Sequence, residues 1–323
     1  MLTGVFRRYA LARSLMDIPN ERSSHSAPTP RGGGVAIVAC VLVGLIFLRA
    51  AGCMPASFFW ALAGAGALVA LIGWADDQKD IPARLRLTGH FIAAGWALFW
   101  LGGLPQLSIA GMLINPGVII NTLALLYLVW LLNLYNFMDG IDGIAGIEAV
   151  TVCTGGVVLC LMSDGKDFLW TVPVLTACGV AGFLFWNFPR ARIFMGDAGS
   201  GFLGIMLGVL SIQAAWVSSE LFWGWLILLG AFIVDATITL LRRILRREKF
   251  YQAHRSHAYQ HAARKYGAHW PVSLAFGAIN LFWLLPIAAL VTAEILDGAL
   301  GVIIGYVPAA AAAIMFNAGK QTE

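Results

Sequence analysis

The sequence predicts an all-α membrane protein, a polytopic helical bundle that crosses the bilayer about ten times, and three observations lead to this fold class. The 323 residues are 59% hydrophobic and 12% charged, whereas soluble proteins carry about 25% charged residues. Their mean hydropathy is +0.79. Long stretches lack Asp, Glu, Lys and Arg altogether, the longest from Leu87 to Met138, and such stretches are long enough to cross a bilayer as helices.

Ten apolar segments have about the 20 residues that a spanning helix needs. They lie near residues 33–50, 57–75, 87–103, 118–135, 145–163, 168–187, 201–217, 221–241, 271–292 and 299–318. Residues 1–323 are therefore predicted to form one integral membrane domain. Leu2 to Phe6 resembles the end of a further span, so we expect a first span upstream of this sequence.

Basic residues predict which loops face the cytoplasm, because Lys and Arg accumulate on that side of a membrane. All 21 of them except Arg49 and Lys166 lie on one side of the predicted spans. This side comprises residues 1–32, 76–86, 136–144, 188–200, 242–270 and the tail after residue 318. We expect it to be cytoplasmic, so the net charge of +4 reflects topology and contact with anionic lipid, and no nucleic-acid partner is predicted.

The polar stretch from Asn133 to Gly143, NLYNFMDGIDG, ends the longest uncharged run. An ionisable side chain at the edge of the hydrocarbon is costly and is a functional candidate by default. If a helix continues through the stretch, Asn133 and Asn136 share one face, as do Asp139 and Asp142, because residues three apart are neighbours on a helix. The pattern predicts a polar surface that forms one side of a catalytic site.

Carboxylates also mark two other helix ends. Asp76 and Asp77 follow the second span, where adjacent carboxylates can share a cation; a solvated helix end is the alternative. Asp197 lies in a Gly-rich turn before another span and could hold Mg²⁺ against a diphosphate, or only cap the helix. Two acids lie within spans: Glu148 is placed to face the bundle interior, and Asp235 has no assigned role.

Arg31 precedes three glycines, Gly32 to Gly34, at a membrane entrance. A cation with exposed backbone N–H groups could bind phosphate there. Membrane anchoring with a flexible hinge is the alternative.

The last basic loop holds His254, His257 and His261 on one predicted helix face. Their neighbours are mainly cations, so Arg255 and His257 suit an anion clamp better than a metal site. A polybasic segment at the membrane surface is the alternative.

All these polar clusters fall on one predicted side of the membrane. Carboxylates at helix ends, with basic groups opposite them, favour a Mg²⁺-dependent site that handles a diphosphate at the cytoplasmic face. The membrane setting indicates that one substrate is a lipid.

Four segments resemble, in this order, the polyprenyl-phosphate N-acetylhexosamine-1-phosphate transferases of glycosyltransferase family 4. They are DD at 76–77, NLYNFMDGIDG at 133–143, FMGDAGS at 194–200 and HRSH at 254–257. The resemblance covers nearly the whole chain, and DIPNERSSHSAPTPRGGG looks closest to the WbpL-like branch, which starts O-antigen synthesis. It implies an enzyme of the bacterial inner membrane that moves an N-acetylated sugar-1-phosphate from a UDP-sugar to undecaprenyl phosphate and releases UMP.

The resemblance also implies roles for individual residues. Asp197 and Asn136 would bind Mg²⁺, or Mn²⁺ in its place. Asp76, Asp77 and Asp139 would be catalytic, with Asp76 either deprotonating the lipid phosphate or attacking the donor. The substrate-binding residues would be Asn133, Asp142, Phe194, Arg84, Arg255 and His257. Of these, Asp142 and Phe194 would hold the uracil. Arg84, Arg255 and His257 would clamp the diphosphate.

The sugar is not specified by these motifs. HRSH at 254–257 stands where the related peptidoglycan enzyme has three consecutive histidines, which argues against a muramoyl-pentapeptide donor. GlcNAc and its 6-deoxy relatives, such as FucNAc and QuiNAc, stay open, as does a homodimer.

Two other classes of protein compete with the enzyme. A secondary transporter places charges near the bilayer midplane and shows paired halves, whereas here the acids gather at helix ends and no internal repeat is visible. A lipid-binding scaffold would tolerate Asp-to-Asn changes without loss of function.

Overall fold

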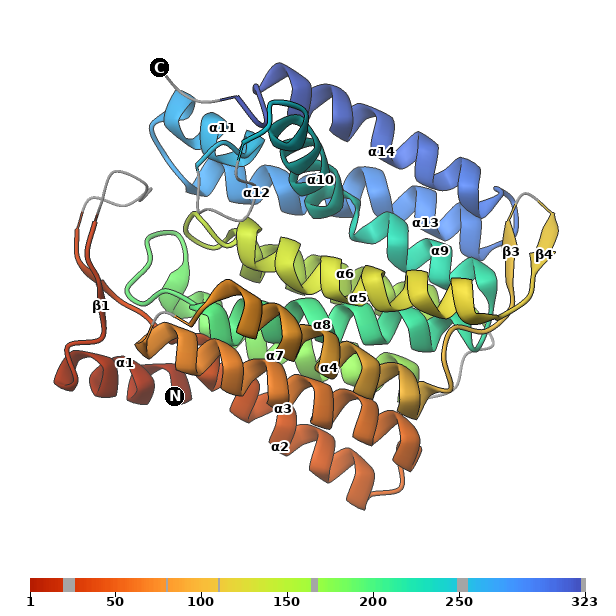
Figure 1. Cartoon of the computed structure of the whole chain (residues 1–323), viewed down its shortest axis with the longest axis horizontal. Helices are drawn as coiled ribbons and strands as arrows, with labels where there is room; N and C mark the ends of the chain where they lie inside the picture. Colours follow the sequence, from red (N-terminus) through yellow and green to blue (C-terminus); the bar gives the residue numbers. More distant parts are fainter. Residues whose placement is uncertain (20–26, 80, 110, 164–167, 249–254, 321–323) are drawn as a thin grey trace.

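The computed structural model describes residues 1–19, 27–79, 81–109, 111–163, 168–248 and 255–320 (Figure 1). Helices fill most of this part of the chain. Their bounds are α1 (Leu2–Ala12), α2 (Gly34–Ala50), α3 (Ala56–Gln78), α4 (Ala83–Leu101), α5 (Val118–Met138), α6 (Ile144–Met162), α7 (Phe168–Asn187), α8 (Asp197–Ala215), α9 (Ser219–Leu228), α10 (Gly230–Leu245), α11 (Ala258–Tyr266), α12 (Trp270–Ile279), the π-helical segment η1 (Asn280–Leu284), α13 (Leu285–Thr292) and α14 (Gly298–Met315). The short strands are β1 (Met16–Asp17), β2 (Thr29–Pro30), β3 (Leu107–Ile109) and β4 (Met112–Ile114).

Seven helical segments in the described ranges are long and apolar enough to cross a membrane, or eight if a bent pair counts as one span. They are α3, α5, α6, α7, α8, the continuous segment from α12 to α13, and α14. The predicted all-α, polytopic fold class is confirmed. The predicted number of about ten spans is approximate, because α2 has only 17 residues and α4 begins with a turn that holds Arg84 and Arg86.

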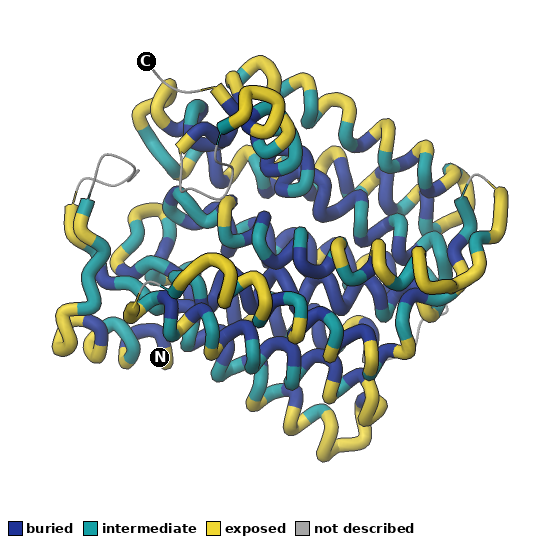
Figure 2. The backbone as a smooth tube through the Cα atoms, viewed as in Figure 1, coloured by how far each residue is buried: buried dark blue, intermediate teal, exposed yellow. Residues whose placement is uncertain are grey.

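Helix α8 forms the buried centre of the bundle, and nearly all of its residues are buried (Figure 2). It packs extensively against α3 and α5. A Cβ atom on Gly204 would lie 2.7 Å from the Leu132 Cα atom, and one on Gly73 would lie 2.5 Å from the backbone of Asp197. Because small residues let spanning helices approach closely, these glycines bring α8 against the ends of α3 and α5.

The span predicted at 221–241 is instead two helices, α9 and α10, bent by 65°. Sharp bends commonly occur at glycine, and Gly230 opens α10 directly beneath the ring of Tyr306. The Tyr306 hydroxyl donates a 2.6 Å hydrogen bond to the Leu226 carbonyl in the last turns of α9. The bend sends α10 toward α11 and the C-terminal part of α14 (Figure 1).

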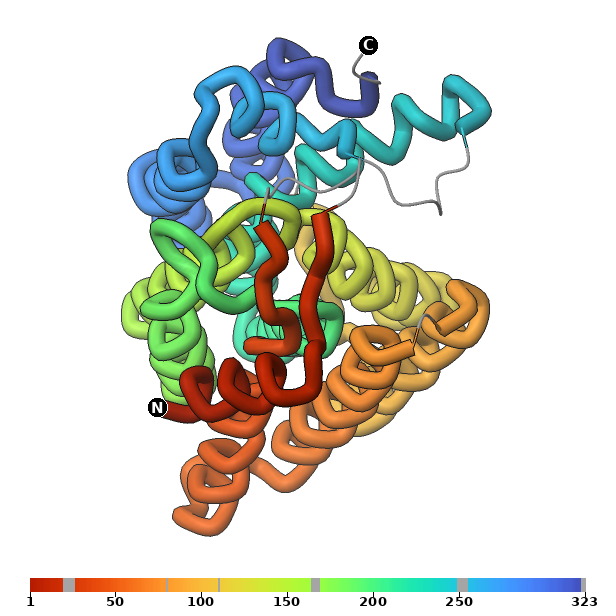
Figure 3. The backbone as a smooth tube through the Cα atoms, turned by 90° about the vertical axis from the view of Figure 1, so that its left-hand side faces the viewer, coloured from red at the N-terminus to blue at the C-terminus, as the bar shows by residue number. Residues whose placement is uncertain are grey.

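The two ends of the bundle differ. One end carries the antiparallel hairpin of β3 and β4, as the Gly- and Pro-rich sequence between 104 and 117 predicts. The opposite end carries α1, the β1–β2 pair, the α5–α6 and α7–α8 connections, and α11 (Figure 3). The described basic segments gather at this second end.

Glu148 on α6 faces the interior, as expected, with 0% exposure. Its Oε2 atom accepts a 2.7 Å hydrogen bond from Asn280, the first residue of η1. This pair lies inside the bundle, where Glu148 is in the second turn of α6, six residues after Asp142.

Candidate active site

The first turn of α8 is the point around which the site is built. Asp197 is the first residue of this helix, Asp76 and Asp77 lie in the last turn of α3, and Asn136 lies in the last turn of α5. Close packing of the three helices therefore brings together acids that are more than 100 residues apart in the sequence.

Asp77 caps α8 from outside the helix. Its carboxylate accepts hydrogen bonds from the backbone N–H groups of Asp197, at 3.1 Å, and Ala198, at 3.3 Å. A helix N-terminus carries unpaired N–H groups and a partial positive charge, so an anion is stabilised there. Gly196 makes this contact feasible, because a Cβ atom at that position would lie 2.6 Å from the Asp77 carboxylate.

Asp76 and Asp197 are joined by a cation that the sequence did not single out. Arg86, at the start of α4, pairs closely with Asp76 Oδ2 and lies 3.4 Å from Asp197 Oδ2. The backbone N–H of Ile81 donates a 2.7 Å hydrogen bond to the other Asp76 oxygen. Arg84, predicted to clamp a diphosphate, is exposed and forms no ion pair with the acids among the described residues.

Arg31 reaches the same cluster, but the adjoining glycines do not offer a phosphate site. Its guanidinium lies 2.7 Å from Asp77 Oδ1. The Gly33 and Gly34 N–H groups donate to the carbonyls of Phe194 and Met195. Of the two alternatives for this segment, the structure therefore disfavours phosphate binding by these two N–H groups, because they hold the chain beside the α7–α8 connection.

The two asparagines of α5 lie at different depths. Asn136 contacts the Asp197 carboxylate, and its Oδ1 atom accepts a 3.3 Å hydrogen bond from the Ser200 hydroxyl. Asn133, one turn deeper, donates to the Val129 carbonyl and contacts the buried His90. Asn136 therefore belongs to the acid cluster, whereas Asn133 lies beneath it.

The helix through Asn133 does not continue to Asp142. Helix α5 ends at Met138, and a turn of residues 139–143 follows, in which Gly143 has φ +79°. The idea that Asp139 and Asp142 share a helical face is wrong, since the chain turns through a left-handed conformation that favours glycine.

Within this turn, Asp139 has an unusual environment. Burial raises the pKa of Asp139 well above its ordinary value, and the nearby carboxylates of Asp197, Asp77 and Asp142 raise this pKa further. No hydrogen bond to the Asp139 side chain is found among the described residues. The surroundings of Asp139 thus favour the protonated form of its carboxyl group.

Asp142 is held from the other side by the start of α12. Its Oδ2 atom lies 3.2 Å from His269 Nδ1, and its carbonyl accepts a 2.7 Å hydrogen bond from the Ser273 hydroxyl. Phe194, the other residue predicted to hold a uracil, is half-buried, and its backbone bonds to Pro30 and Gly33.

The last basic loop adjoins this turn through α11. His257, only 2% exposed, lies with its Nδ1 atom 3.3 Å from the Asp235 carboxylate. Arg255 is exposed, and His254 lies outside the described residues. The hydroxyl of Tyr259 donates a 3.0 Å hydrogen bond to the Phe137 carbonyl, one residue before the end of α5.

The side chains of Asp197 and Asn136 suit Mg²⁺ if a substrate phosphate supplies further oxygen ligands. In the described parts of the chain, no three His, Cys, Asp or Glu side chains converge to hold an ion by themselves. Arg31 pairs with Asp77 and Arg86 with Asp76, whereas the Asp197 side chain is 27% exposed, lies at the longer distance of 3.4 Å from Arg86 and contacts the side-chain amide of Asn136. Mg²⁺ is usually bound through one or two carboxylates plus substrate phosphates, so Asp197 and Asn136 fit it.

Sequence reasoning missed Arg86, Tyr259 and His269 as members of this end of the bundle. Arg86 carried a weak signal, because it follows Asp76 at the next helix start. Tyr259 and His269 carried none, since only the folded positions of α11 and α12 bring them to the 139–143 turn.

The fold and this cluster define a multi-pass membrane protein with an acidic, arginine-compensated site at one end of its helices. The family model described as Glycosyl transferase family 4 matches residues 59–215. A phospho-N-acetylmuramoyl-pentapeptide-transferase of Synechococcus elongatus is 30% identical over 257 residues, which cover 74% of this chain and 67% of that protein. The chain belongs to glycosyl transferase family 4, which confirms the resemblance.

Two further relatives are similar over most of the chain. A probable undecaprenyl-phosphate N-acetylglucosaminyl 1-phosphate transferase of Bacillus subtilis is 27% identical over 276 residues, covering 80% of this chain and 72% of the relative. A decaprenyl-phosphate N-acetylglucosaminephosphotransferase of Mycolicibacterium smegmatis is 31% identical over 275 residues, covering 76% and 66%. The chain thus spans between 66% and 72% of the length of these two relatives.

Proposed function

We propose that this chain transfers an N-acetylhexosamine-1-phosphate from a UDP-sugar to undecaprenyl phosphate and releases UMP, at the cytoplasmic face of a bacterial inner membrane. The observation that carries the proposal is the meeting of Asp76, Asp77, Asp139 and Asp197 at the basic end of a membrane bundle. The names of two relatives support the reaction type, because both refer to N-acetylglucosamine phosphate transfer and to a polyprenyl phosphate.

In this reaction a phosphate oxygen of the lipid attacks the phosphorus next to the sugar. The bond from that phosphorus to the bridging oxygen breaks, and UMP leaves with the bridging oxygen. Two polyanions must approach each other, so fixed cations have to offset their repulsion. Arg31 and Arg86 supply positive charge beside the acids, and Arg84, Arg255 and His257 remain our proposed diphosphate clamp.

The two kinds of acid suit different tasks. Both Asp76 oxygens accept hydrogen bonds, from Arg86 and from the Ile81 N–H group, which stabilises the carboxylate as an anion. Burial and the neighbouring carboxylates raise the pKa of Asp139, which favours its protonated form. We assign proton exchange with a phosphate oxygen to Asp139, and positioning of the cations to Asp76 and Asp77.

Asp197 and Asn136 would hold Mg²⁺, or Mn²⁺, and the bound ion would neutralise and orient the diphosphate. Removal of the ion with EDTA should therefore stop transfer, and added Mg²⁺ should restore it. Asp142 and Phe194 would contact the uracil. Asn133, which lies one helical turn deeper than Asn136, would support the site from the interior of the bundle.

A doubly labelled donor tests the reaction. UDP-GlcNAc that carries ³H in the sugar and ³²P in the phosphate next to it is incubated with the purified chain, undecaprenyl phosphate and Mg²⁺. We expect both labels in the lipid phase at their original ratio, with one UMP released per lipid product. Sugar label alone in the lipid would contradict phosphosugar transfer. Uptake into sealed vesicles without lipid labelling would favour a secondary transporter instead.

The sugar and the biological role are finer proposals. We propose GlcNAc or a 6-deoxy relative such as FucNAc or QuiNAc as the donor sugar, and the start of an O-antigen as the role. Competition of unlabelled UDP-sugars against the labelled donor ranks the candidates, and the preferred donor should have the lowest KM.

A further inference from the structure

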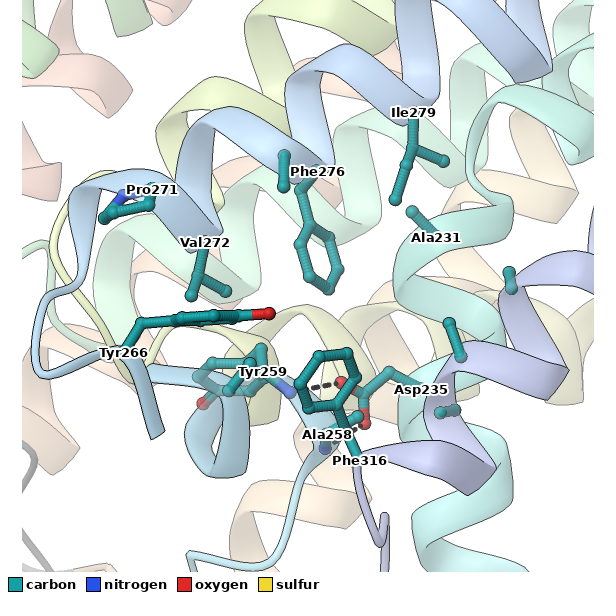
Figure 4. A pocket seen from close by; sticks show the side chains of 15 residues that line it. Ala231, Asp235, Ala258, Tyr259, Tyr266, Pro271, Val272, Phe276, Ile279 and Phe316 are labelled. Atoms are coloured by element: carbon teal, nitrogen blue, oxygen red, sulfur yellow. Dashed lines mark hydrogen bonds between the residues drawn. The ribbon is translucent and has the colours of Figure 1, made fainter. Parts of the chain in front are cut away.

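Asp235 is a buried acid that the proposed reaction does not use. It lies on α10, beyond the bend, and is 3% exposed. One side of it lines a cavity of about 400 Å³ among α10, α11, α12 and α14, with walls formed mainly by alanines and by Phe276 and Phe316 (Figure 4). An apolar wall offers no hydrogen bonds, so the carboxylate depends on the groups on its other side.

Most of those groups belong to the start of α11, and one belongs to α10 itself. Asp235 Oδ1 accepts a 3.0 Å hydrogen bond from the Ala258 N–H, and Oδ2 accepts one of 3.0 Å from the Tyr259 N–H (Figure 4). His257 Nδ1 lies 3.3 Å from Oδ1, and the Thr239 hydroxyl donates to the same oxygen at 3.2 Å. Both oxygens are therefore used, and two of the contacts are to N–H groups in the first turn of a helix.

The same turn of α11 touches the proposed catalytic turn. The Tyr259 hydroxyl donates to the Phe137 carbonyl, and its ring stacks with that of His257 at 5.5 Å between centroids. Gly140 makes the approach possible, because a Cβ atom there would collide with the Tyr259 hydroxyl. Tyr259 thus connects Asp235, which its backbone N–H contacts, to the turn that holds Asp139, which its hydroxyl approaches.

We infer that Asp235 is a positioning residue for the transfer reaction, an inference that rests on the proposed function. It sets the rotation of the His257 ring through Nδ1 and fixes the first turn of α11 against the Asp139 turn. The Gln260 N–H group also donates to the His257 side chain in the capping box of α11, so Asp235 and Gln260 together hold the orientation of the ring at the start of this helix.

Asp235→Asn is the informative substitution. An amide of the same size keeps one acceptor oxygen but points an NH₂ group at N–H donors, so one of the contacts of Asp235 becomes donor against donor. We expect kcat/KM for the UDP-sugar to fall about 10- to 100-fold, with an unchanged KM for undecaprenyl phosphate. Thr237→Val is the matched control, because Thr237 lies on the same helix and its buried hydroxyl has no partner among the described residues.

A double-mutant cycle separates positioning from general loss of structure. If Asp235 acts through His257, then Asp235→Asn should cost less than 3-fold in a His257→Gln background. An equal loss in both backgrounds would overturn the inference, as would a wild-type rate for Asp235→Asn.

Failure of the proposed function is distinguishable, because the wild-type chain would then show no transfer. In that case amide hydrogen exchange decides: the Ala258 and Tyr259 amides should exchange faster in Asp235→Asn and not in Thr237→Val, and equal exchange would overturn the inference.

Discussion

Asp77 and Asp139 belong to the same site, but their surroundings differ. Asp77 accepts hydrogen bonds from two backbone N–H groups at the start of α8 and pairs with Arg31. Asp139 has acids for neighbours and no such partner among the described residues. The same residue type therefore caps a helix in one place and is our proposed proton carrier in the other.

Asp139→Asn should separate stability from activity. The folded chain holds the Asp139 proton at pH values where the unfolded chain, with an ordinary pKa near 3.8, has released it. Asp139 therefore lowers the free energy of unfolding as pH rises from about 3.8 to its raised folded pKa. We expect Asp139→Asn to raise the Tm in detergent at pH 7.5, by less at pH 4.5, and to reduce transfer about 10²- to 10⁴-fold. A Tm difference that grows toward acid pH would contradict this assignment.

Arg86 and Arg84 provide a matched pair of neighbouring cations. Arg86 pairs with Asp76 and approaches Asp197, whereas Arg84 is exposed. Loss of the Arg86 charge leaves part-buried acids uncompensated, so Arg86→Ala should reduce kcat about 100-fold or more. Arg84→Ala, as a binding residue, should raise the KM for the UDP-sugar with a smaller effect on kcat. Equal effects on kcat would contradict the distinction.

At the scale of elements, apolar length predicted helices well but did not predict where they bend or stop. Helix α5 ends at Met138, and Gly143, whose φ is +79°, permits the turn that follows. The three-residue spacing of the Asn and Asp residues in this stretch had indicated a continuous helix instead. The bend between α9 and α10 depends on a contact with Tyr306, about 80 residues away. Such tertiary contacts leave no local trace in the sequence.

Gly73→Ala tests whether helix packing sets the geometry of the site. Its Cβ atom would lie 2.5 Å from the backbone of Asp197, so α3 and α8 must separate where their acids meet. We expect a lower Tm and a fall in transfer of about 10-fold or more. Gly95→Ala on α4 is the control, because its Cβ atom would meet nothing within 4 Å; in open space this change should leave the Tm unchanged or raise it slightly. Equal losses in both variants would refute the role of packing.

At the scale of the whole molecule, the convergence of distant acids was predictable from charge placement. Asp76, Asp77 and Asp197 all end or begin spans on the basic side of the chain, and they lie together in the structure. Their individual partners were not predictable, because the choice of Arg86 over Arg84 depends on the rotation of α4. His257 was placed at the site end of the bundle, but its pairing with Asp235 required the bend in α10.

Cysteine labelling tests the predicted orientation. In a cysteine-free background, single cysteines are introduced at the exposed Arg255, near the site, and at the exposed Leu113, in the hairpin at the opposite end. A membrane-impermeant maleimide added to intact cells should label Leu113→Cys and spare Arg255→Cys, because the distribution of Lys and Arg predicts that the basic end faces the cytoplasm. The reverse pattern would contradict a cytoplasmic site.

Transfer by Asp197→Asn, measured in nanodiscs beside the wild type, tests the central claim most directly. Glu220→Gln is the control, since Glu220 lies in the first turn of α9, beyond the other end of α8. If the acids at the first turn of α8 form the transfer site, Asp197→Asn should lose at least 100-fold in lipid-linked sugar phosphate while Glu220→Gln keeps the wild-type rate. Wild-type transfer by a correctly folded Asp197→Asn protein would contradict the account.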